Sequence, residues 1–225
     1  MKRLSKLIII EGLDGSGKST QVQLLSERLK QRGIKVRQIK LPDYDHKSST
    51  LVKMYLGGEF GRNPEDVNAY TASLFYAADR FASYKNYWKE DYENGTVIVA
   101  DRYVTSNAVH QMVKLPKEEW EDYLAWSEDL EYGKVGIPRP DLVVFLDMPV
   151  DISQRLMTKR YQGDEVKKDV HEADVDYLTR CHETAAFTSE KQNWNIVACA
   201  ENGEPRSIES IADEIISIVE RKLSF

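Results

Sequence analysis

A glycine-rich segment near the amino terminus limits the possible folds more than any other feature. Residues 12–19 read GLDGSGKS, which fits the pattern G-x-x-x-x-G-K-[ST] at every fixed position. An aliphatic run, Lys6 to Glu11, precedes it, and apolar residues at helical spacing follow it as far as Gly33. The stretch Ile34 to Leu41 is predicted to be a second strand, which Pro42 ends. A strand, a glycine turn, a helix and a second strand in this order predict a βαβ unit of a parallel sheet.

The chemistry of this segment is that of a phosphate-binding loop. Glycines allow successive backbone N–H groups to point at one phosphate, and the helix that follows adds the positive end of its dipole. Lys18 is expected to reach the β- and γ-phosphates, and the Ser19 hydroxyl to contact Mg²⁺. The predicted contacts to the phosphates of ATP are Gly12, Leu13, Asp14, Gly15, Ser16, Gly17, Lys18, Ser19 and Thr20.

Such a loop does not define a reaction, because GTPases, ATPases and small-molecule kinases share it. A guanine-specific protein would need an N-K-x-D tetrad, and the sequence has none. The net charge of −6 argues against a general nucleic-acid or anionic-membrane binder, which requires a basic excess. The sequence has only two cysteines, and the apolar run Leu7–Ile10 is too short for a signal peptide or a membrane span. We therefore expect a cytoplasmic protein.

Strands and helices alternate along the rest of the chain. Further strands are predicted at Thr96–Ala100, Leu142–Leu146 and Asn195–Cys199. Helices are predicted at 64–93, 117–132, 150–160, 173–192 and from 208 onward. This alternation predicts the α/β class, with three α/β/α layers and a parallel central sheet of about five strands, in a single domain over 1–225. The polar segment 161–172 lacks apolar periodicity and is predicted to be an insert.

An aspartate follows two of these strands, at the edge where parallel sheets bind ligands. Asp101 is the better candidate for holding Mg²⁺, because Arg102 adjoins it and an arginine can clamp a phosphate through two N–H groups. The alternative for these two residues is a surface ion pair at a strand end. Asp147 is followed by Met148 and Pro149 and is predicted to be structural.

Asp79 and Arg80 lie in the long predicted helix, about one turn after Phe75. Phe75 and Arg80 could present a stacking ring beside a cationic clamp. The alternative is that Phe75 belongs to the core, because aromatic residues at helical spacing more often pack inside.

These motifs in this order, followed by the run R-P-D-L at 139–142, resemble the thymidylate kinase (dTMP kinase) family from about Leu7 to Glu220. The resemblance implies a nucleoside monophosphate kinase that transfers the γ-phosphoryl group of ATP to dTMP, giving dTDP and ADP in dTTP biosynthesis. It also implies Mg²⁺, held by Ser19 and Asp101, and ATP and dTMP as the partners. The residues that it places in catalysis are Lys18, Arg102, Asp14 and Arg160.

The resemblance assigns roles in acceptor binding as well. Phe75 would stack on thymine, Arg80 would bind the carbonyl edge of the base, and Tyr103 would crowd the sugar 2′ position. Asp14 would hold the sugar 3′-hydroxyl or the metal shell, and Arg102 would bridge the two phosphates. The full set implied for dTMP is Pro42, Tyr44, Phe75, Arg80, Arg102, Tyr103, Ser106, Asn107 and Gln111.

Segment 161–172 corresponds in this resemblance to a lid. The cations that it assigns to the lid are Arg155, Arg160, Lys167 and Lys168. Gly15 or Ser16 stands where some members of the family carry an arginine in the phosphate loop, so Arg160 is expected to reach the ATP phosphates instead. The alternative is a solvated charged segment.

The stretch after the second strand departs from the family. Members often read F-P-x-R there, with the arginine on the acceptor phosphate, whereas this chain reads LPDYDHK at 41–47. Tyr44 or Lys47 could substitute, or the acceptor phosphate could be held otherwise.

Alternatives to a dTMP kinase follow from the same residues. One is another nucleoside monophosphate kinase. Another is a deoxynucleoside kinase, which needs a carboxylate base after the second strand, where only Asp43 is available. A third is a non-catalytic nucleotide-binding module, against which the intact Lys18 and Asp101 argue. The resemblance further implies a homodimer that packs through the long helix 64–93.

Overall fold

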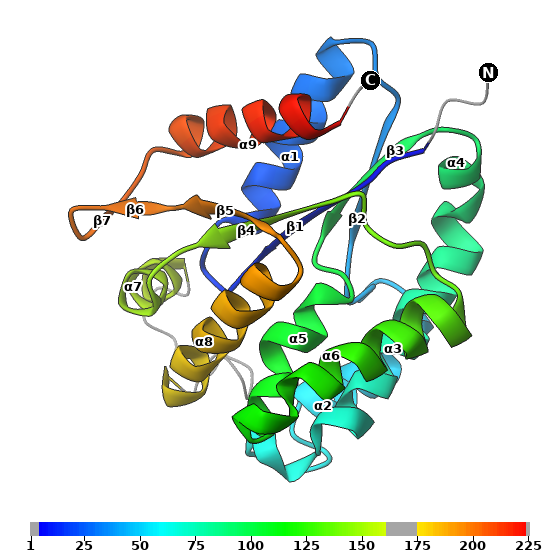
Figure 1. Cartoon of the computed structure of the whole chain (residues 1–225), viewed down its shortest axis with the longest axis vertical. Coiled ribbons are helices and arrows are strands. Elements are labelled where there is room, and N and C mark those ends of the chain that lie inside the picture. The colour runs from blue at the N-terminus through cyan, green and yellow to red at the C-terminus, as the bar shows by residue number, and fades with distance from the viewer. Residues whose placement is uncertain (1–4, 161–174, 224–225) are drawn as a thin grey trace.

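The computed structural model describes residues 5–160 and 175–223. Its centre is a five-stranded sheet in the order β2-β3-β1-β4-β5, in which every neighbouring pair is parallel (Figure 1). The strands, with a C-terminal hairpin, are β1 Leu7–Gly12, β2 Val36–Lys40, β3 Val97–Asp101, β4 Leu142–Asp147, β5 Asn195–Ala198, β6 Ala200–Glu201 and β7 Glu204–Pro205. The predicted α/β class with a five-stranded parallel sheet is confirmed.

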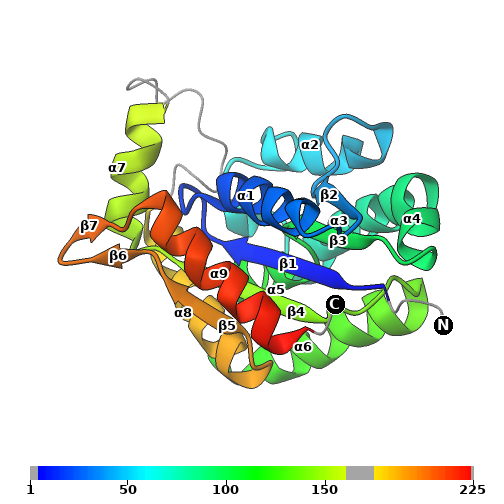
Figure 2. The ribbon, with the colours of Figure 1, turned by 90° about the horizontal axis from the view of Figure 1, so that it is seen from above.

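Helices cover both faces of the sheet, with α1 and α9 on one face and α3, α5, α6 and α8 on the other (Figure 2). The α-helices are α1 Lys18–Gln31, α2 Thr50–Leu56, α3 Ala69–Ser83, α4 Lys89–Glu93, α5 Thr105–His110, α6 Trp120–Glu128, α7 Val150–Arg160, α8 Val175–Lys191 and α9 Ile208–Lys222. The shorter turns are the 3₁₀ segments Lys47–Ser49, Pro64–Asp66, Met112–Lys114 and Lys117–Glu119 and the π-helical segments Tyr84–Trp88 and Asp129–Val135.

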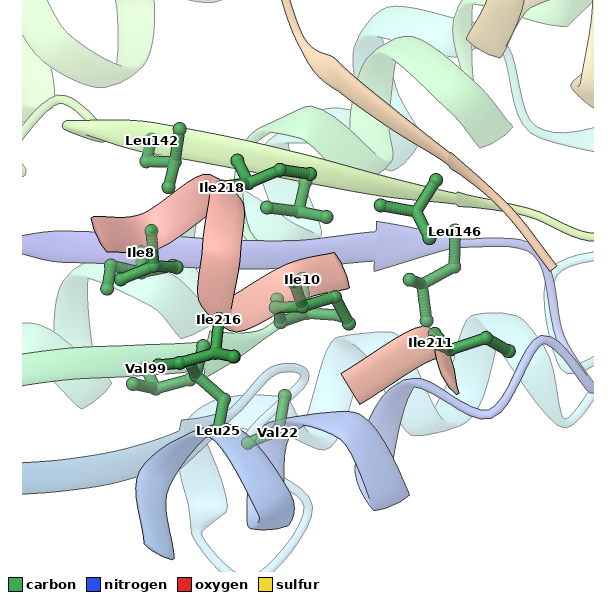
Figure 3. Packing of buried hydrophobic residues seen from close by; sticks show 14 of the residues in the cluster. Ile8, Ile10, Val22, Leu25, Val99, Leu142, Leu146, Ile211, Ile216 and Ile218 are labelled. Atoms are coloured by element: carbon green, nitrogen blue, oxygen red, sulfur yellow. The ribbon is translucent and has the colours of Figure 1, made fainter. Parts of the chain in front are cut away.

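The side chains of β1 alternate between two cores. Ile8 and Ile10 face α1 and α9 (Figure 3), whereas Leu7 and Ile9 pack with Trp88 on the opposite face. The whole strand is buried. A strand covered on both faces needs apolar residues at every position, which explains its uninterrupted aliphatic run.

The sequence patterns left several elements undetected. The predicted helix 64–93 is divided into a 3₁₀ turn, α3, a π-helical segment and α4. The short helices α2 and α5 were not expected, and neither was the β6–β7 hairpin. That hairpin turns at Asn202 and Gly203, whose φ angles of 53° and 77° suit the Asn-Gly turn that such hairpins prefer.

The register of the sheet brings the ends of three strands to one edge. Ile10 of β1 lies beside Asp101 of β3, and Gly12 lies beside Leu146 of β4. Residues that follow these strands therefore meet at the carboxyl edge, where open α/β sheets bind ligands. Within residues 5–160 and 175–223, no helix is both long and apolar enough to cross a bilayer.

Candidate active site

The loop between β1 and α1 turns through left-handed backbone. Gly15 and Gly17 have φ angles of 81° and 87°, a region that only glycine adopts readily. Gly15 also has no room for a side chain, because an added Cβ would lie 2.7 Å from the Ser153 carbonyl oxygen. Glycine at these positions allows the chain to enter α1 with its first N–H groups exposed to an anion.

Lys18 lies across this loop. Its Nζ donates to the carbonyl oxygens of Gly12 and Leu13 at 2.9 and 2.8 Å, and the residue is only 7% exposed. Burial lowers the pKa of Lys18, and Arg102 lowers it further, against the opposing effect of Asp14. An added negative charge, such as a phosphate, would therefore stabilise the charged form of Lys18.

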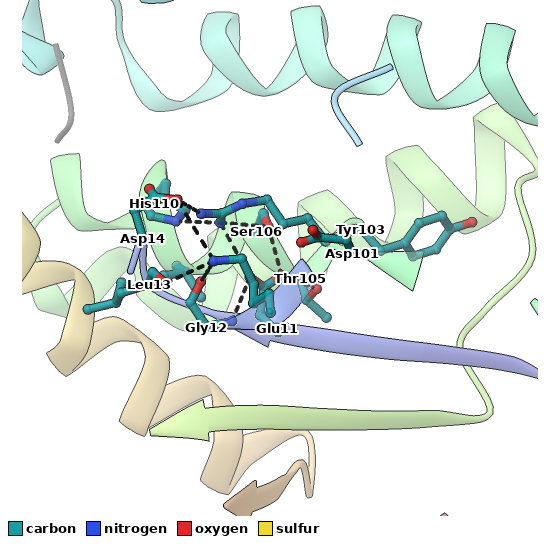
Figure 4. A network of polar contacts seen from close by, with 12 residues as sticks. Glu11, Gly12, Leu13, Asp14, Asp101, Tyr103, Thr105, Ser106 and His110 are labelled. Carbon is teal, nitrogen blue, oxygen red and sulfur yellow. Dashed lines mark hydrogen bonds and ion pairs between the residues drawn. The ribbon is translucent and has the colours of Figure 1, made fainter. Parts of the chain in front are cut away.

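A polar network that includes Glu11, Asp14 and His110 lies at the end of β3 (Figure 4). Arg102 is at its centre. Its φ of 69° turns the chain sharply after Asp101. Its Nη2 donates to Asp14 Oδ1 at 2.5 Å, and Nη1 lies 2.8 Å from His110 Nε2 and 3.4 Å from Glu11 Oε1. Burial raises the pKa of Asp14, but Arg102 and Lys18 outweigh it and hold that pKa well below its usual range.

Glu11 is part of this network and was not among the predicted site residues. It is fully buried, and its carboxylate accepts from the Gly12 N–H at 3.0 Å, Thr105 Oγ1 at 2.6 Å and Ser106 Oγ at 2.7 Å. An acidic residue at the end of an apolar strand, directly before the glycine motif, was a signal that could have found it. Glu11 ties the phosphate loop to α5.

Ser19 and Asp101 meet beside the loop, as predicted for a metal site. Ser19 Oγ donates to Asp101 Oδ2 at 2.5 Å, so the two oxygens could share one cation. A hydroxyl and a carboxylate are hard oxygen ligands that suit Mg²⁺, which takes few protein ligands and completes its shell with water and phosphate oxygens. The residues present therefore fit a magnesium ion that arrives with a nucleotide.

A cavity opens beside Arg102. It is bounded by the loop after β2, by α3, and by the end of β3 with α5. Its lining residues are Asp14, Leu41, Pro42, Tyr44, Leu56, Tyr76, Asp79, Arg80, Arg102, Tyr103, Ser106, Asn107, His110 and Gln111. Of the nine residues predicted for dTMP, the structure brings all except Phe75 into this lining.

Phe75 is the exception because it lies on a different face of α3 from Arg80. Phe75 packs against Tyr55 and Phe60, with ring centroids 6.3 and 5.6 Å away, and does not line the cavity. Tyr76 lines it instead, because it lies four residues before Arg80 and so on the same helical face. The prediction that Phe75 lines the cavity is therefore wrong, and Tyr76 lies in that position instead.

Arg80 is buried at the cavity wall, and its neighbour Asp79 also lines the cavity while it anchors a loop. The Nε of Arg80 donates to Glu131 Oε1 at 3.1 Å, its Nη2 makes a second bond to the same oxygen, and Nη1 lies 3.4 Å from the Tyr103 carbonyl oxygen. Burial lowers the pKa of Arg80, but Glu131 raises it by more. Asp79 accepts from the Asp43 N–H and the Ser48 hydroxyl, which anchors the loop after β2 to α3.

Tyr103 lines the cavity but is fully buried. Its hydroxyl donates to the Pro138 carbonyl oxygen at 2.9 Å, and burial raises its pKa well above the usual value. Only the ring is therefore presented to a ligand. Ser106, Asn107 and Gln111 follow on α5 and just after it, and all three line the cavity.

Asp43 does not face this cavity. Its carboxylate accepts from Ser83 Oγ at 2.8 Å and lies 2.7 Å from His46 Nδ1, beside a separate surface groove. The carboxylate that a deoxynucleoside kinase would need after the second strand is thus held away from the cavity.

The predicted lid residues fall partly outside the described structure. Arg155 of α7 turns to the β6–β7 hairpin, where it pairs with Glu204 at 3.3 Å and donates to the Gly203 carbonyl oxygen at 2.8 Å. Arg160 is the last residue of α7. Lys167, Lys168 and the lid segment 161–172 lie outside the described residues.

A phosphate loop, a strand-end acid for Mg²⁺ and an adjoining cavity with buried arginines define a nucleotide-dependent phosphotransferase of the P-loop class. Comparison with known proteins identifies the family within this class. The family model for thymidylate kinase matches residues 10–212. The chain is 31% identical over 218 residues to a probable thymidylate kinase of Thermococcus gammatolerans, with 96% of each chain covered.

Other relatives agree. The thymidylate kinase of Danio rerio is 28% identical over 225 residues, with 98% of this chain and 95% of the relative covered. The solved thymidylate kinase of Candida albicans superimposes with a TM-score of 0.69 at 23% identity, covering 96% of this chain and 92% of that one, so it shares the fold. The chain belongs to the thymidylate kinase family and is a nucleoside monophosphate kinase. These matches give no support to a deoxynucleoside kinase or a non-catalytic module.

Proposed function

We propose that this chain transfers the γ-phosphoryl group of ATP to dTMP, giving dTDP and ADP on the route to dTTP. The observation that carries the proposal is the continuity of the cavity with the phosphate loop. Arg102 and Asp14 line one end of the cavity and contact each other, while Lys18 lies 3.8 Å from Asp14. A nucleoside monophosphate in the cavity would place its phosphate beside that of a nucleotide held in the loop.

The donor side is held by the loop. Lys18 would exchange the Gly12 and Leu13 carbonyl oxygens for the β- and γ-phosphates. N–H groups of the loop and of the first turn of α1 would surround the same phosphate oxygens. Ser19 and Asp101 would hold Mg²⁺, which when bound neutralises the charge that develops on the transferred group. Arg160 is proposed to approach these phosphates from the end of α7.

The acceptor side is held by α3 and α5. Tyr76 stacks on the base, Arg80 donates to its carbonyl edge, and Asn107 and Gln111 contact the rest of the base. Arg102 bridges the acceptor phosphate and the transferred phosphoryl group.

The reaction needs no general base. An oxygen of the dTMP phosphate forms the new bond to the γ-phosphorus, and the bond from that phosphorus to the β–γ bridging oxygen breaks, which leaves ADP. The attacking oxygen already carries negative charge, so the protein supplies position and positive charge. The placement of Asp43 outside the cavity fits this chemistry.

We also propose that the protein is a cytoplasmic homodimer formed by a single domain. The outer face of α3 carries exposed apolar side chains at helical spacing, with Leu74 48% and Phe81 43% exposed, which suits packing against a second copy. Cys181 and Cys199 are both free thiols, as in proteins of a reducing compartment.

The test is ADP release with ATP, Mg²⁺ and one acceptor at a time. We expect turnover with dTMP, less with dUMP, and little with dCMP, AMP or thymidine. Turnover of thymidine without turnover of dTMP would assign the protein to nucleoside kinases. Absence of turnover with every acceptor would refute the proposed reaction.

A further inference from the structure

Glu131 lies behind the acceptor cavity and is fully buried. It belongs to the π-helical segment Asp129–Val135 that follows α6, a type of distortion often found at functional sites. Its carbonyl oxygen accepts from the N–H groups of Gly136 and Ile137 at 3.0 and 3.2 Å, and Gly136 closes the segment with a φ of 78°. These two hydrogen bonds fix the backbone of Glu131 against the residues that follow the π-helical segment.

The side chain of Glu131 reaches across to α3 and α5. Its Oε1 accepts from Nε and Nη2 of Arg80 and, at 3.5 Å, from Nδ2 of Asn107. Arg80 is 2% exposed and Glu131 is not exposed at all. A buried guanidinium is retained only when a carboxylate and further acceptors satisfy it, so Glu131 is what holds Arg80 at this depth.

This contact decides which groups the two cavity-lining residues present. With Nε and Nη2 of Arg80 on Glu131, Nη1 is the remaining edge of the guanidinium, and it lies near the Tyr103 carbonyl oxygen at the cavity wall. With its amide nitrogen on Glu131, Asn107 keeps its carbonyl oxygen as an acceptor. The wall therefore offers a donor and an acceptor in a fixed arrangement.

That arrangement matches one class of pyrimidine. Thymine presents the O4 carbonyl acceptor next to its N3–H donor, whereas cytosine presents an amino donor next to an unprotonated nitrogen. We propose that Glu131 is a positioning residue that orients Arg80 and Asn107 and thereby sets the preference for dTMP over dCMP. This inference rests on the proposed function and extends it to the residue that stands behind the base-reading groups.

The experiment compares Glu131→Gln with Glu128→Gln. Glu128 lies one helical turn earlier and pairs with Arg139 on the surface at 2.7 Å, so its variant changes the same charge away from the cavity. For Glu131→Gln we expect the KM for dTMP to rise about tenfold, as for the loss of one charge-assisted hydrogen bond. The dTMP-to-dCMP ratio of kcat/KM should fall by a similar factor, while the KM for ATP stays unchanged. Glu128→Gln should match the wild type.

A second variant tests the proposal in case Glu131→Gln fails to fold. Glu131→Asp keeps the charge and shortens the reach to Arg80, so thermal unfolding should show a folded protein while the dTMP-to-dCMP ratio still falls. An unchanged ratio in folded Glu131→Gln or Glu131→Asp would overturn the positioning role. A wild-type enzyme without activity on dTMP would instead overturn the proposed function, so the two failures are distinguishable.

Discussion

The phosphate loop and the acceptor cavity share Asp14, which accepts from Arg102 at the cavity wall, yet they are assembled in different ways. The loop is one contiguous stretch between β1 and α1, and its function depends on local backbone geometry at Gly15 and Gly17. The cavity draws on α3, α5, the loop after β2 and the end of β3, and Glu131 supports it from a distant segment. A local backbone requirement leaves a readable spacing in the sequence, whereas a cavity built from tertiary contacts does not.

The largest expected effect is that of a substitution at Lys18, which should impair the phosphate loop and leave the acceptor cavity intact. Lys18→Ala removes the charge that neutralises the transferred phosphoryl group, so kcat should fall by about 10³-fold. The affinity for dTMP should change by less than about threefold, because Lys18 does not line the cavity. ADP release gives kcat, and calorimetric titration of dTMP gives the affinity. An equal loss of both would show that the two regions do not function separately.

A smaller effect distinguishes Tyr76 from Phe75 within the cavity wall. Tyr76→Ala should raise the KM for dTMP by about tenfold or more, since stacking a base on an aromatic ring is worth about 1–3 kcal/mol. Phe75→Ala should leave that KM unchanged and lower the free energy of unfolding by about 2 kcal/mol, because Phe75 packs with Tyr55 and Phe60. Steady-state kinetics and urea unfolding of both variants test the assignment. The opposite pattern would return the stacking role to Phe75.

The two aromatic residues also mark the limit of sequence reasoning. Apolar runs located the central strands β1, β3 and β4, because strands buried on both faces need apolar residues throughout. The edge strands β2 and β5 are only partly buried, and they were located from short stretches of mixed polarity. Helical periodicity located α3 but not its rotation, and successive residues differ by about 100° around a helix. The prediction of Phe75 in the cavity lining was therefore wrong by one residue. The packing of Phe75 on Tyr55 and Phe60 shows this, and the four-residue spacing from Tyr76 to Arg80 agrees with it.

Glu11 and Glu131 show a second limit. Both are buried carboxylates whose partners come from elsewhere in the chain: Thr105 and Ser106 for Glu11, and Arg80 for Glu131. A charged residue in an apolar setting is reasonable only when its partners are known, and no local pattern names them. Glu11 could have been suspected from its place before the glycine motif, whereas Glu131 carries no such signal.

The smallest expected effect concerns the other strand-end acid. Asp101 accepts from Ser19 at the phosphate loop, whereas Asp147 lies 2.6 Å from His182 Nε2 of α8. The hydrogen bond with Asp147 raises the pKa of His182 above its ordinary value of 6.5, against the effect of burial. The partner of Asp147 thus lies on α8, whereas the partner of Asp101 lies at the phosphate loop. A structural role for Asp147 was expected from Met148 and Pro149, which follow it.

This ion pair should make stability depend on pH in one direction. Because the folded pKa of His182 is raised, the stabilisation is complete below pH 6.5 and is lost as the pH rises through the folded pKa. Both side chains are more than a third exposed, so solvent screening limits the effect to about 0.5 kcal/mol. Urea unfolding measures the free energy of unfolding of the wild type and of Asp147→Asn. The advantage of the wild type should be about 0.5 kcal/mol larger at pH 5.5 than at pH 8.5. The kcat at neutral pH should be equal in the two proteins. A gap that widens toward high pH would reverse the sign and show that His182 does not stabilise the fold through Asp147.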